Sequence, residues 1–270
     1  MVITNGFFSP MSIQIAFNAF SQRGTGKANN EDAILLAGQV HQGRVRQRGA
    51  VDTSQPRYFA VADGVSIGTL PRTASRRLLE LLQNRLSTAD ATASLAALLR
   101  QVQNDYVALS DANAQFAGMA STLVGARLIG NCATIFNVGD SRAYLLTGDA
   151  SAPQIQLLSR DHSFLNDLID DGEMTQAQSE TAASFMRGLT SQFIVDAEFD
   201  DFKVYVVSHA MQPGERLLLC SDGLNEVLSD TQIANLLVNH GEDDLLNACK
   251  ASRRAGGTDD FSAIVLALQD

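Results

Sequence analysis

Apolar residues alternate with polar ones near both ends of the chain, and this period of two is typical of β-strands. Near the start, residues 12–20 place Ile13, Ile15 and Phe17 on one face. Other short apolar runs stand between turn residues, and we expect them to be strands as well. These runs are residues 33–40, 57–64, 121–129, 131–140, 202–208, 215–220 and 261–268, and residues 141–159 read as a hairpin that turns at Gly148-Asp149.

Helical periodicity dominates four stretches between the strands. Residues 72–87 and 91–113 each carry leucines at the spacing of one buried helix face. A third helix is predicted to begin with Ser229 or Asp230 as its N-cap, and a fourth covers residues 243–254. Core packing accounts for these apolar stripes without any cofactor.

Two polar segments interrupt this pattern. Residues 161–200 contain short helix-like pieces and polar joints, which indicates an excursion from the sheet layers. Residues 41–56 are polar and locally basic, and we expect an exposed loop or hairpin tip there. The blocks of strands and helices do not alternate as in a parallel βαβ sheet, so they predict an α+β fold with antiparallel sheets and outer helices. Because no linker or repeat is visible, residues 1–270 are predicted to be one domain with a core at about residues 12–268.

The charge and the cysteines exclude several classes of protein. A net charge of −10 disfavours binding to nucleic acids or anionic membranes. The three cysteines, Cys132, Cys220 and Cys249, form no CxxC pair, so we expect reduced core residues. No apolar run approaches the length of a membrane span, and the N-terminus lacks the pattern of a signal peptide. We therefore expect a soluble, cytoplasmic protein without a membrane span, and a monomer.

Acidic residues recur where the predicted strands begin or end. Asp63-Gly64, Gly139-Asp140 and Asp222-Gly223 follow strands, whereas Glu31-Asp32 and Asp259-Asp260 precede them. Each pair alone is ordinary turn chemistry. Five together indicate carboxylates that converge at one edge of packed sheets, where they would repel one another without a divalent cation. Aspartate oxygens suit Mg²⁺ or Mn²⁺, and the lack of paired histidine or cysteine ligands argues against zinc.

Seven segments, in this order, resemble the metal-dependent serine/threonine protein phosphatases of the type 2C (PPM) family, in its bacterial branch. They are "NNEDA", "FAVADGVSIG", "ASTLVGARL", "VGDSRAYLL", "LSRDHSFLNDLIDDGEMT", "LLLCSDGLNEVLSD" and "GGTDDFSAIVL". The resemblance covers about residues 15–268. It implies a four-layer αββα sandwich, with two central antiparallel β-sheets flanked by helices and a flap subdomain at about residues 161–200.

The resemblance also implies a site for two metal ions. Asp63 matches the aspartate that bridges both ions, and Gly64 matches the residue whose carbonyl binds the second ion. Glu31 matches a carboxylate on that second ion. Asp32 matches the acidic residue beside it, which acts mostly through water.

The first ion and a third one complete the implied site. Asp222 and Asp259 match ligands of the first ion, and with Asp63 they are the predicted catalytic residues. Asp140 matches a ligand of a third ion, which Asp222 would share. The implied cofactor is Mn²⁺ or Mg²⁺.

The resemblance predicts the hydrolysis of phosphoserine and phosphothreonine in proteins by a hydroxide held between the ions. The implied partners are phosphorylated proteins and a cognate bacterial Ser/Thr kinase whose action the enzyme would reverse in signal transduction. Two alternatives stay open, a pseudophosphatase that acts as an interaction module and a phosphatase for small phosphate esters. A thiol phosphatase is disfavoured, because Cys220 is not followed by a glycine-rich, arginine-terminated phosphate loop.

The chain departs from the family pattern at several positions. Lys27 stands where the family carries an arginine that grips the substrate phosphate, and lysine keeps the charge but lacks the planar fork, so weaker phosphate binding is expected. Arg23 is a second candidate for that contact. Asp260 replaces an asparagine and is either an extra carboxylate near the ions or a turn carboxylate. The basic loop 41–57 either docks an acidic partner or is solvated, and His162 is expected to be structural.

Overall fold

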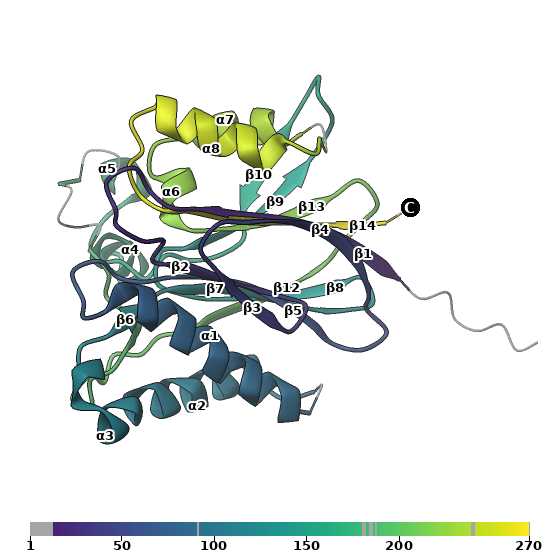
Figure 1. The fold of residues 1–270 in the computed structure, drawn as a ribbon. Helices are drawn as coiled ribbons and strands as arrows, with labels where there is room; N and C mark the ends of the chain where they lie inside the picture. The colour runs from purple at the N-terminus through teal and green to yellow at the C-terminus, as the bar shows by residue number, and fades with distance from the viewer. Residues whose placement is uncertain are drawn as a thin grey trace, which may run out of the picture.

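Two six-stranded β-sheets lie face to face at the centre of the molecule, and helices cover both outer faces (Figure 1). The computed structural model describes residues 13–90, 92–179, 182–183, 186, 188–238 and 241–269. Every strand pair described in the two sheets is antiparallel. The first sheet has the order β10 (Gln154–Leu157), β9 (Arg142–Thr147), β13 (Arg216–Cys220), β14 (Phe261–Leu268), β1 (Gln14–Gln22) and β4 (Val45–Asp52). The second has the order β12 (Tyr205–Ala210), β8 (Cys132–Val138), β7 (Leu123–Ile129), β5 (Arg57–Asp63), β2 (Asp32–Leu36) and β3 (Gln39–Gln42).

Alternate residues of the strands form the core between the sheets. Ile15, Phe17 and Ala19 of β1 point into this core, and the rings of Phe17 and Phe59 have centroids 5.4 Å apart. A register shift of one residue would turn each apolar face outward, so burial of these faces fixes the register. The strand ends are thereby held at defined positions along one edge of the sandwich.

Two long helices cover the outer face of the second sheet. They are α1 (Pro71–Thr88) and α2 (Leu95–Val107), whose leucines pack with that sheet in one apolar cluster. Proline at the first turn of α1 suits a helix start, because its missing N–H would lack a partner there anyway. The Ser94 side chain accepts a hydrogen bond from Ala97 N and caps α2.

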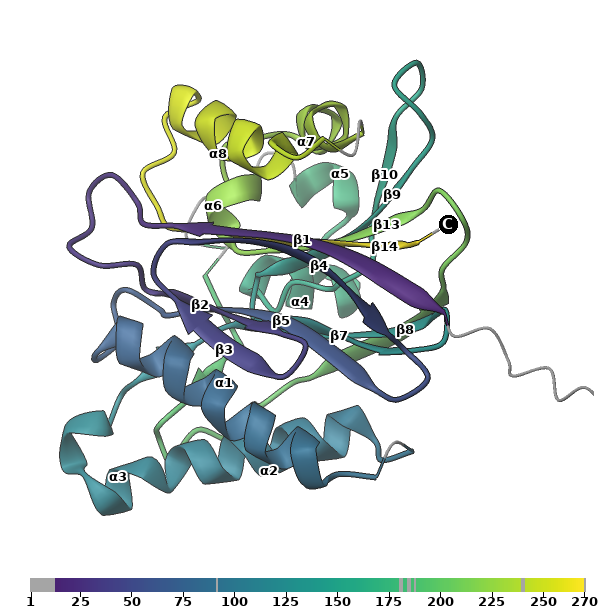
Figure 2. The same ribbon diagram turned by 45° about the vertical axis from the view of Figure 1, so that its right-hand side comes forward.

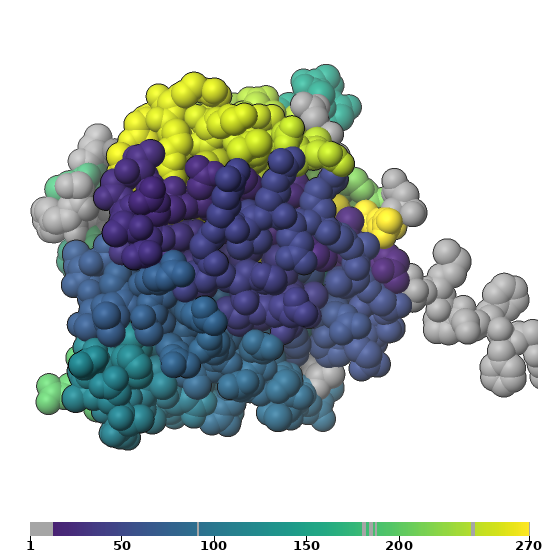
Figure 3. Space-filling model, in the orientation of Figure 1, coloured from purple at the N-terminus to yellow at the C-terminus, as the bar shows by residue number. Residues whose placement is uncertain are grey.

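Three further helices cover the first sheet, as a second view shows (Figure 2). They are α6 (Asp222–Asn225), α7 (Asp230–Leu237) and α8 (Asp244–Arg254). Ser229 is the N-cap of α7 and forms a capping box with Gln232. In the space-filling view, the yellow α8 region and the blue α1 and α2 region lie at opposite sides of the purple N-terminal strands (Figure 3). The α+β, four-layer fold predicted from the sequence is confirmed.

The strands after β1 differ from the prediction. Residues 33–40 are two strands, because Ala37 and Gly38 adopt positive φ angles of 48° and 94° and turn the chain between β2 and β3. The predicted loop 41–56 is mostly the edge strand β4, which pairs with β1 from Gln14↔Asp52 to Ser21↔Val45. The strand was not predicted because its sequence is polar. Polar, exposed side chains are typical of a strand at the edge of a sheet.

Smaller differences concern one helix and one cysteine. The predicted helix 91–113 begins at Leu95 and breaks at Ala108, before α3 (Leu109–Ala112) and the 3₁₀ helix η1 (Ala114–Phe116), while residue 91 lies outside the described residues. Cys132 is exposed at the hairpin turn between β7 and β8, so its assignment to the core was wrong. The strand predicted at 12–20 is β1, and residue 12 lies outside the described part of the chain.

The segment 161–200 leaves the sheets as expected, although residues 180, 181, 184, 185 and 187 are not described. It contains α4 (Phe164–Asp170), α5 (Gln176–Ser179) and β11 (Phe193–Ile194), which pairs with β6 (Ala120–Ser121). No described helix is both long and apolar enough to cross a bilayer. The assignment of residues 1–270 to one domain stays a prediction.

Candidate metal and phosphate site

The acidic residues singled out in the sequence meet at one end of the sandwich. Asp32 and Asp63 face each other in register across β2 and β5. Burial, followed by the charges of Asp32, Asp222, Asp259 and Asp140, raises the pKa of Asp63 well above its usual value. Carboxylates that are far apart would not influence one another in this way, so the fold brings all five aspartates together.

Asp32 is the most deeply buried of the group, with no exposed surface. Ser221 Oγ donates a hydrogen bond to Asp32 Oδ2 at 2.9 Å, whereas Oδ1 is buried and has no partner in the described structure. Burial and the charge of Asp260 raise the pKa of Asp32 to about 7. A carboxylate oxygen buried without a donor is stabilised by a cation or a water molecule.

Asp222 begins α6, directly after β13. Its Oδ1 is also buried without a partner in the described part of the chain. Burial and the charge of Asp259 raise the pKa of Asp222 to about 6. The orphaned oxygens of Asp32 and Asp222 therefore fit a site for hard cations, which bind carboxylate oxygens.

Gly64 lies where no side chain fits. A Cβ atom at this position would overlap the carbonyl oxygen of Pro71, at the start of α1. Gly64 N donates to the Glu31 carbonyl oxygen at 3.3 Å, which ties the end of β5 to the residue before β2. The close approach of these backbones requires glycine and keeps Glu31 beside Asp63.

Lys27 lies among the carboxylates, where it binds predicted metal ligands. Its Nζ is 2.8 Å from Glu31 Oε2, forms an ion pair with Asp259 Oδ1, and is 3.1 Å from Ser66 Oγ. Burial alone would lower the Lys27 pKa, but the bonds to Asp259 and Glu31 outweigh it, and the pKa is raised. Among the described residues, no three His, Cys, Asp or Glu side chains are arranged to hold an ion as they stand.

Asp260 binds backbone, which supports its role as a structural carboxylate. Its Oδ1 accepts a hydrogen bond from Gly24 N at 2.6 Å, and its Oδ2 accepts one from Glu31 N at 2.7 Å. Only a carboxylate offers both acceptors, since an asparagine amide would turn its NH₂ group toward one N–H. Asp260 thus positions the loop that carries Lys27 and Glu31.

A comparison with known proteins agrees with this geometry. The family model described as protein phosphatase 2C matches residues 35–252. The chain belongs to this family. This match confirms the family predicted from the sequence. Relatives of the chain are named serine/threonine phosphatases, which is the activity that the sequence predicts.

Individual relatives are bacterial. The serine/threonine protein phosphatase PstP of Mycobacterium tuberculosis is 27% identical over 267 residues, which cover 96% of this chain and 46% of PstP. The serine/threonine phosphatase stp of Listeria monocytogenes is 30% identical over 187 residues, which cover 66% of this chain and 70% of stp. The solved catalytic domain of PstP in complex with 2 manganese ions matches with a TM-score of 0.70 and 23% identity, covering 95% of this chain and 100% of that one. The chain spans about half the length of the PstP proteins that it matches.

Asp140 lies where the phosphatase 2C domain opens into a cleft. Burial, then the charges of Asp222 and Asp161, raise the pKa of Asp140 to about 7. The cleft has a volume of about 780 Å³ and reaches from Asp140 and Asp222 to the flap segment. Its walls include Arg142 and Arg160, which are paired with Asp161 and Asp170.

Two arginines support the site without having been predicted. Arg142 donates to both carboxylate oxygens of Asp161, at 2.7 to 3.0 Å, beside Asp140. Arg253 of α8 donates to the Asp259 carbonyl oxygen at 2.6 Å. Arg142 could have been predicted, because it belongs to the "VGDSR" segment that resembles the family. Arg253 could not, because it belongs to no such segment.

The remaining candidates are structural. Arg23 donates to the carbonyl oxygens of Lys27 and Ala28, so it braces the loop through backbone contacts. His162 Nδ1 accepts from Gly139 N at 3.1 Å, and burial lowers the pKa of this histidine, as expected of a structural residue. Burial raises the pKa of Cys220 to about 12, which leaves no thiolate for nucleophilic attack at neutral pH.

Proposed function

We propose that this protein is a metal-dependent phosphatase that hydrolyses phosphoserine and phosphothreonine in proteins. The observation that carries the proposal is the convergence of Asp63 with Asp32, Asp140, Asp222 and Asp259 at one end of the sandwich. Such a concentration of buried negative charge destabilises a fold, and it has a chemical use where cations bind. Family membership supplies the reaction class.

The carboxylate donors present suit Mn²⁺ or Mg²⁺ in their chemistry, and an ion would have to displace Lys27 from Glu31 and Asp259. We assign Asp63, Gly64 and Glu31 to one ion, with Asp32 acting beside them, and Asp222 and Asp259 to the other; the aspartate Asp63 would serve both ions. Two such ions lower the pKa of a water molecule and neutralise charge on phosphoryl oxygens. The catalytic domain of the relative PstP, solved in complex with 2 manganese ions, supports this assignment.

A third ion is a further part of the proposal. Asp140 lies close enough to Asp222 for the charge of Asp222 to raise its pKa. Both residues line the same cleft. We assign Asp140 and Asp222 to this third position.

The chain itself binds and orients the substrate. Lys27 Nζ is held at the carboxylates by Glu31 and Ser66, so it places a fixed positive charge where the phosphate would lie. Arg142 and Arg160 also line the cleft, where each is paired with an aspartate, Asp161 or Asp170. A phosphorylated segment of a protein is the substrate class that suits this open, charged cleft, and a cognate Ser/Thr kinase is the expected partner.

The test measures hydrolysis of p-nitrophenyl phosphate and of a phosphothreonine peptide with Mn²⁺, with EDTA, and in the variant Asp222→Asn. Activity should require the metal and be lost in Asp222→Asn, while Asp111→Asn, an exposed carboxylate on α3, should match the unaltered protein. Activity that survives both EDTA and Asp222→Asn would refute the metal mechanism. No activity with any metal would favour a pseudophosphatase, and activity confined to p-nitrophenyl phosphate would favour small esters. The cytoplasmic location and the monomeric state stay predictions.

A further inference from the structure

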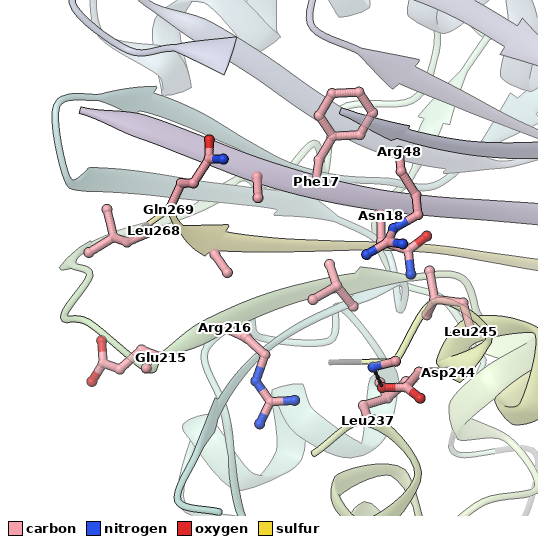
Figure 4. A pocket seen from close by; sticks show the side chains of 15 residues that line it. Phe17, Asn18, Arg48, Glu215, Arg216, Leu237, Asp244, Leu245, Leu268 and Gln269 are labelled. Carbon is pink, nitrogen blue, oxygen red and sulfur yellow. Dashed lines mark hydrogen bonds between the residues drawn. The ribbon is translucent and has the colours of Figure 1, made fainter. Parts of the chain in front are cut away.

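A second cavity lies between the first sheet and the helices α7 and α8 (Figure 4), and none of the proposed metal ligands lines it. Its volume is about 370 Å³, within the range of small-molecule sites. Arg216, the first residue of β13, lines it, whereas Asp222 follows the other end of that strand. At about 3.3 Å per residue, the two positions are up to roughly 20 Å apart.

Arg216 points toward the helices because successive side chains of a β-strand point to opposite faces of the sheet. Leu217 and Leu219 point into the core between the sheets, so Arg216 and Leu218 point the other way. Figure 4 shows the Arg216 guanidinium on the side of the cavity where Leu237 of α7 lies. The side chain therefore extends into the space between sheet and helices.

Two nitrogens of this guanidinium are buried without a hydrogen-bond partner. Arg216 is 1% exposed, and its Nε and Nη1 atoms are buried with no hydrogen-bond acceptor in the described structure. A buried charge without a counter-ion destabilises a folded protein, and buried arginines are almost always paired. The position thus lacks the anion that would normally accompany it.

The neighbouring charged residues do not supply that anion. Asp244, at the start of α8, accepts a hydrogen bond from Gly241 N at 2.7 Å; its charge acts on Arg216, but no ion pair joins the two side chains within the described residues. Arg48 reaches the cavity from β4, but its Nη1 binds Glu242 at 2.7 Å. Glu215 also lines the cavity, but its Oε2 binds His209 Nε2 and Gln212 N. The cavity therefore has a cation without a hydrogen-bond acceptor at its wall, and its two carboxylates, Asp244 and Glu215, would repel a dianion more than a monoanion.

The rest of the lining combines apolar and polar side chains. Leu237 and Leu245 come from the helices, and Val265 and Leu268 from β14. The Asn18 amide lies on the sheet side, as Figure 4 shows. A ligand that fits these walls combines one planar anionic group with a short apolar body.

We propose that this cavity binds a small organic monocarboxylate, whose carboxylate group accepts hydrogen bonds from Arg216 and whose apolar part lies against Leu237 and Leu245. The planar guanidinium matches a carboxylate in shape and charge. The proposal is independent of the phosphatase reaction, because the site shares no residue with the proposed metal ligands.

The experiment uses the full chain in EDTA at pH 7.5, with sodium acetate, butyrate, hexanoate or phosphate added at constant ionic strength. The melting temperature should rise saturably with the carboxylates, and more with hexanoate than with acetate because the longer chain contacts the leucines. Arg216→Met should raise the dissociation constant for hexanoate by about tenfold or more. It should also keep or raise the melting temperature without ligand, because it removes an unpaired charge. Arg100→Met, at an exposed position on α2, should respond as the unaltered protein does.

Several results would overturn the proposal. These are no response to any carboxylate, a response that persists in Arg216→Met, or a larger Arg216-dependent response to phosphate than to hexanoate. A marked loss of stability in ligand-free Arg216→Met would show that Arg216 has a partner within the protein. If that variant does not fold, NMR of the unaltered protein decides: the amide signals of Arg216 and Leu245 should shift saturably with hexanoate, and shifts confined to other regions would reject the site.

Discussion

Replacing Asp222 by asparagine should stabilise the metal-free protein at pH 8 while abolishing its activity. The substitution keeps the size of the side chain and removes one negative charge from a buried group of carboxylates. Asp222 Oδ1 has no hydrogen-bond partner in the described structure, and an asparagine amide can donate to Asp63, the side chain to which Asp222 is hydrogen-bonded. The variant therefore tests two effects of Asp222 separately: the loss of folding stability that its charge causes, and its contribution to catalysis.

The size of the effect follows from the raised pKa of Asp222. Burial and the charge of Asp259 raise this pKa from 3.8 to about 6, and one pH unit corresponds to about 1.4 kcal/mol. The ionised carboxylate thus lowers the free energy of unfolding by up to about 3 kcal/mol. We expect Asp222→Asn to recover about half of this amount, because neighbouring carboxyl groups take up protons and already relieve part of the repulsion in the unaltered protein. For a domain of this size, each kcal/mol shifts the melting temperature by roughly 2–4 °C.

The pH at which stability is measured determines whether Asp222→Asn raises the free energy of unfolding. The folded state holds the Asp222 proton more tightly than the unfolded state does, so this contribution to stability is complete below pH 3.8 and is lost as the pH rises through about 6. Thermal unfolding in EDTA should therefore show a more stable variant at pH 8 and a difference about half as large at pH 5. With Mn²⁺ at pH 8 the order should reverse, because only the unaltered protein keeps its full set of ligands. Equal differences at both pH values, or a less stable variant at pH 8 in EDTA, would refute the reasoning.

Three other substitutions test separate parts of the site. Gly64→Ala should lower the free energy of unfolding by about 1–3 kcal/mol in urea titrations, since its Cβ would overlap the Pro71 carbonyl oxygen, and unchanged stability would show that α1 can move away. Lys27→Met should lower the melting temperature in EDTA at pH 8 and raise KM for a phosphopeptide more than it lowers kcat; if neither changes, Lys27 is a solvated charge and another group binds the phosphate. Cys220→Ala should retain metal-dependent turnover, with about 1 kcal/mol or more lost in stability from the cavity, and loss of turnover in a folded variant would revive a role for the thiol.

Sequence periodicity predicted the elements that bury one face. β1 and the helices α1, α7 and α8 follow from it, because each hides an apolar stripe. β4 was missed because an edge strand that pairs through its backbone leaves side chains such as Arg46 and Arg48 in solvent, so no apolar alternation is required. The turn at Ala37-Gly38 was missed because alanine rarely adopts a positive φ.

The candidate site could be predicted in part for a similar reason. Aspartates next to predicted strand ends are visible as a local sequence pattern. The pairing of β2 with β5 in the register Asp32↔Asp63 then places two of these aspartates next to each other. The hydrogen bonds of Asp260 with Gly24 and Glu31 join residues far apart in the chain, and no local pattern encodes them. Asp260, for example, binds Glu31 N across a separation of 229 residues.

Lys27 explains how the fold tolerates this site before a cation binds. Three carboxylates, those of Glu31, Asp259 and Asp260, lie within 4 Å of its ammonium group. An ammonium group donates three hydrogen bonds in divergent directions, so it can serve several acceptors at once, whereas a guanidinium fork is planar and suits one carboxylate or phosphate. We therefore expect lysine, in place of the arginine that the family resemblance implies at this position, to bind a phosphate more weakly and to be a better internal counter-ion. The same exchange makes Lys27 a competitor of the metal ions for Glu31 and Asp259, so affinity for Mn²⁺ and affinity for the substrate phosphate are expected to be linked through this one residue.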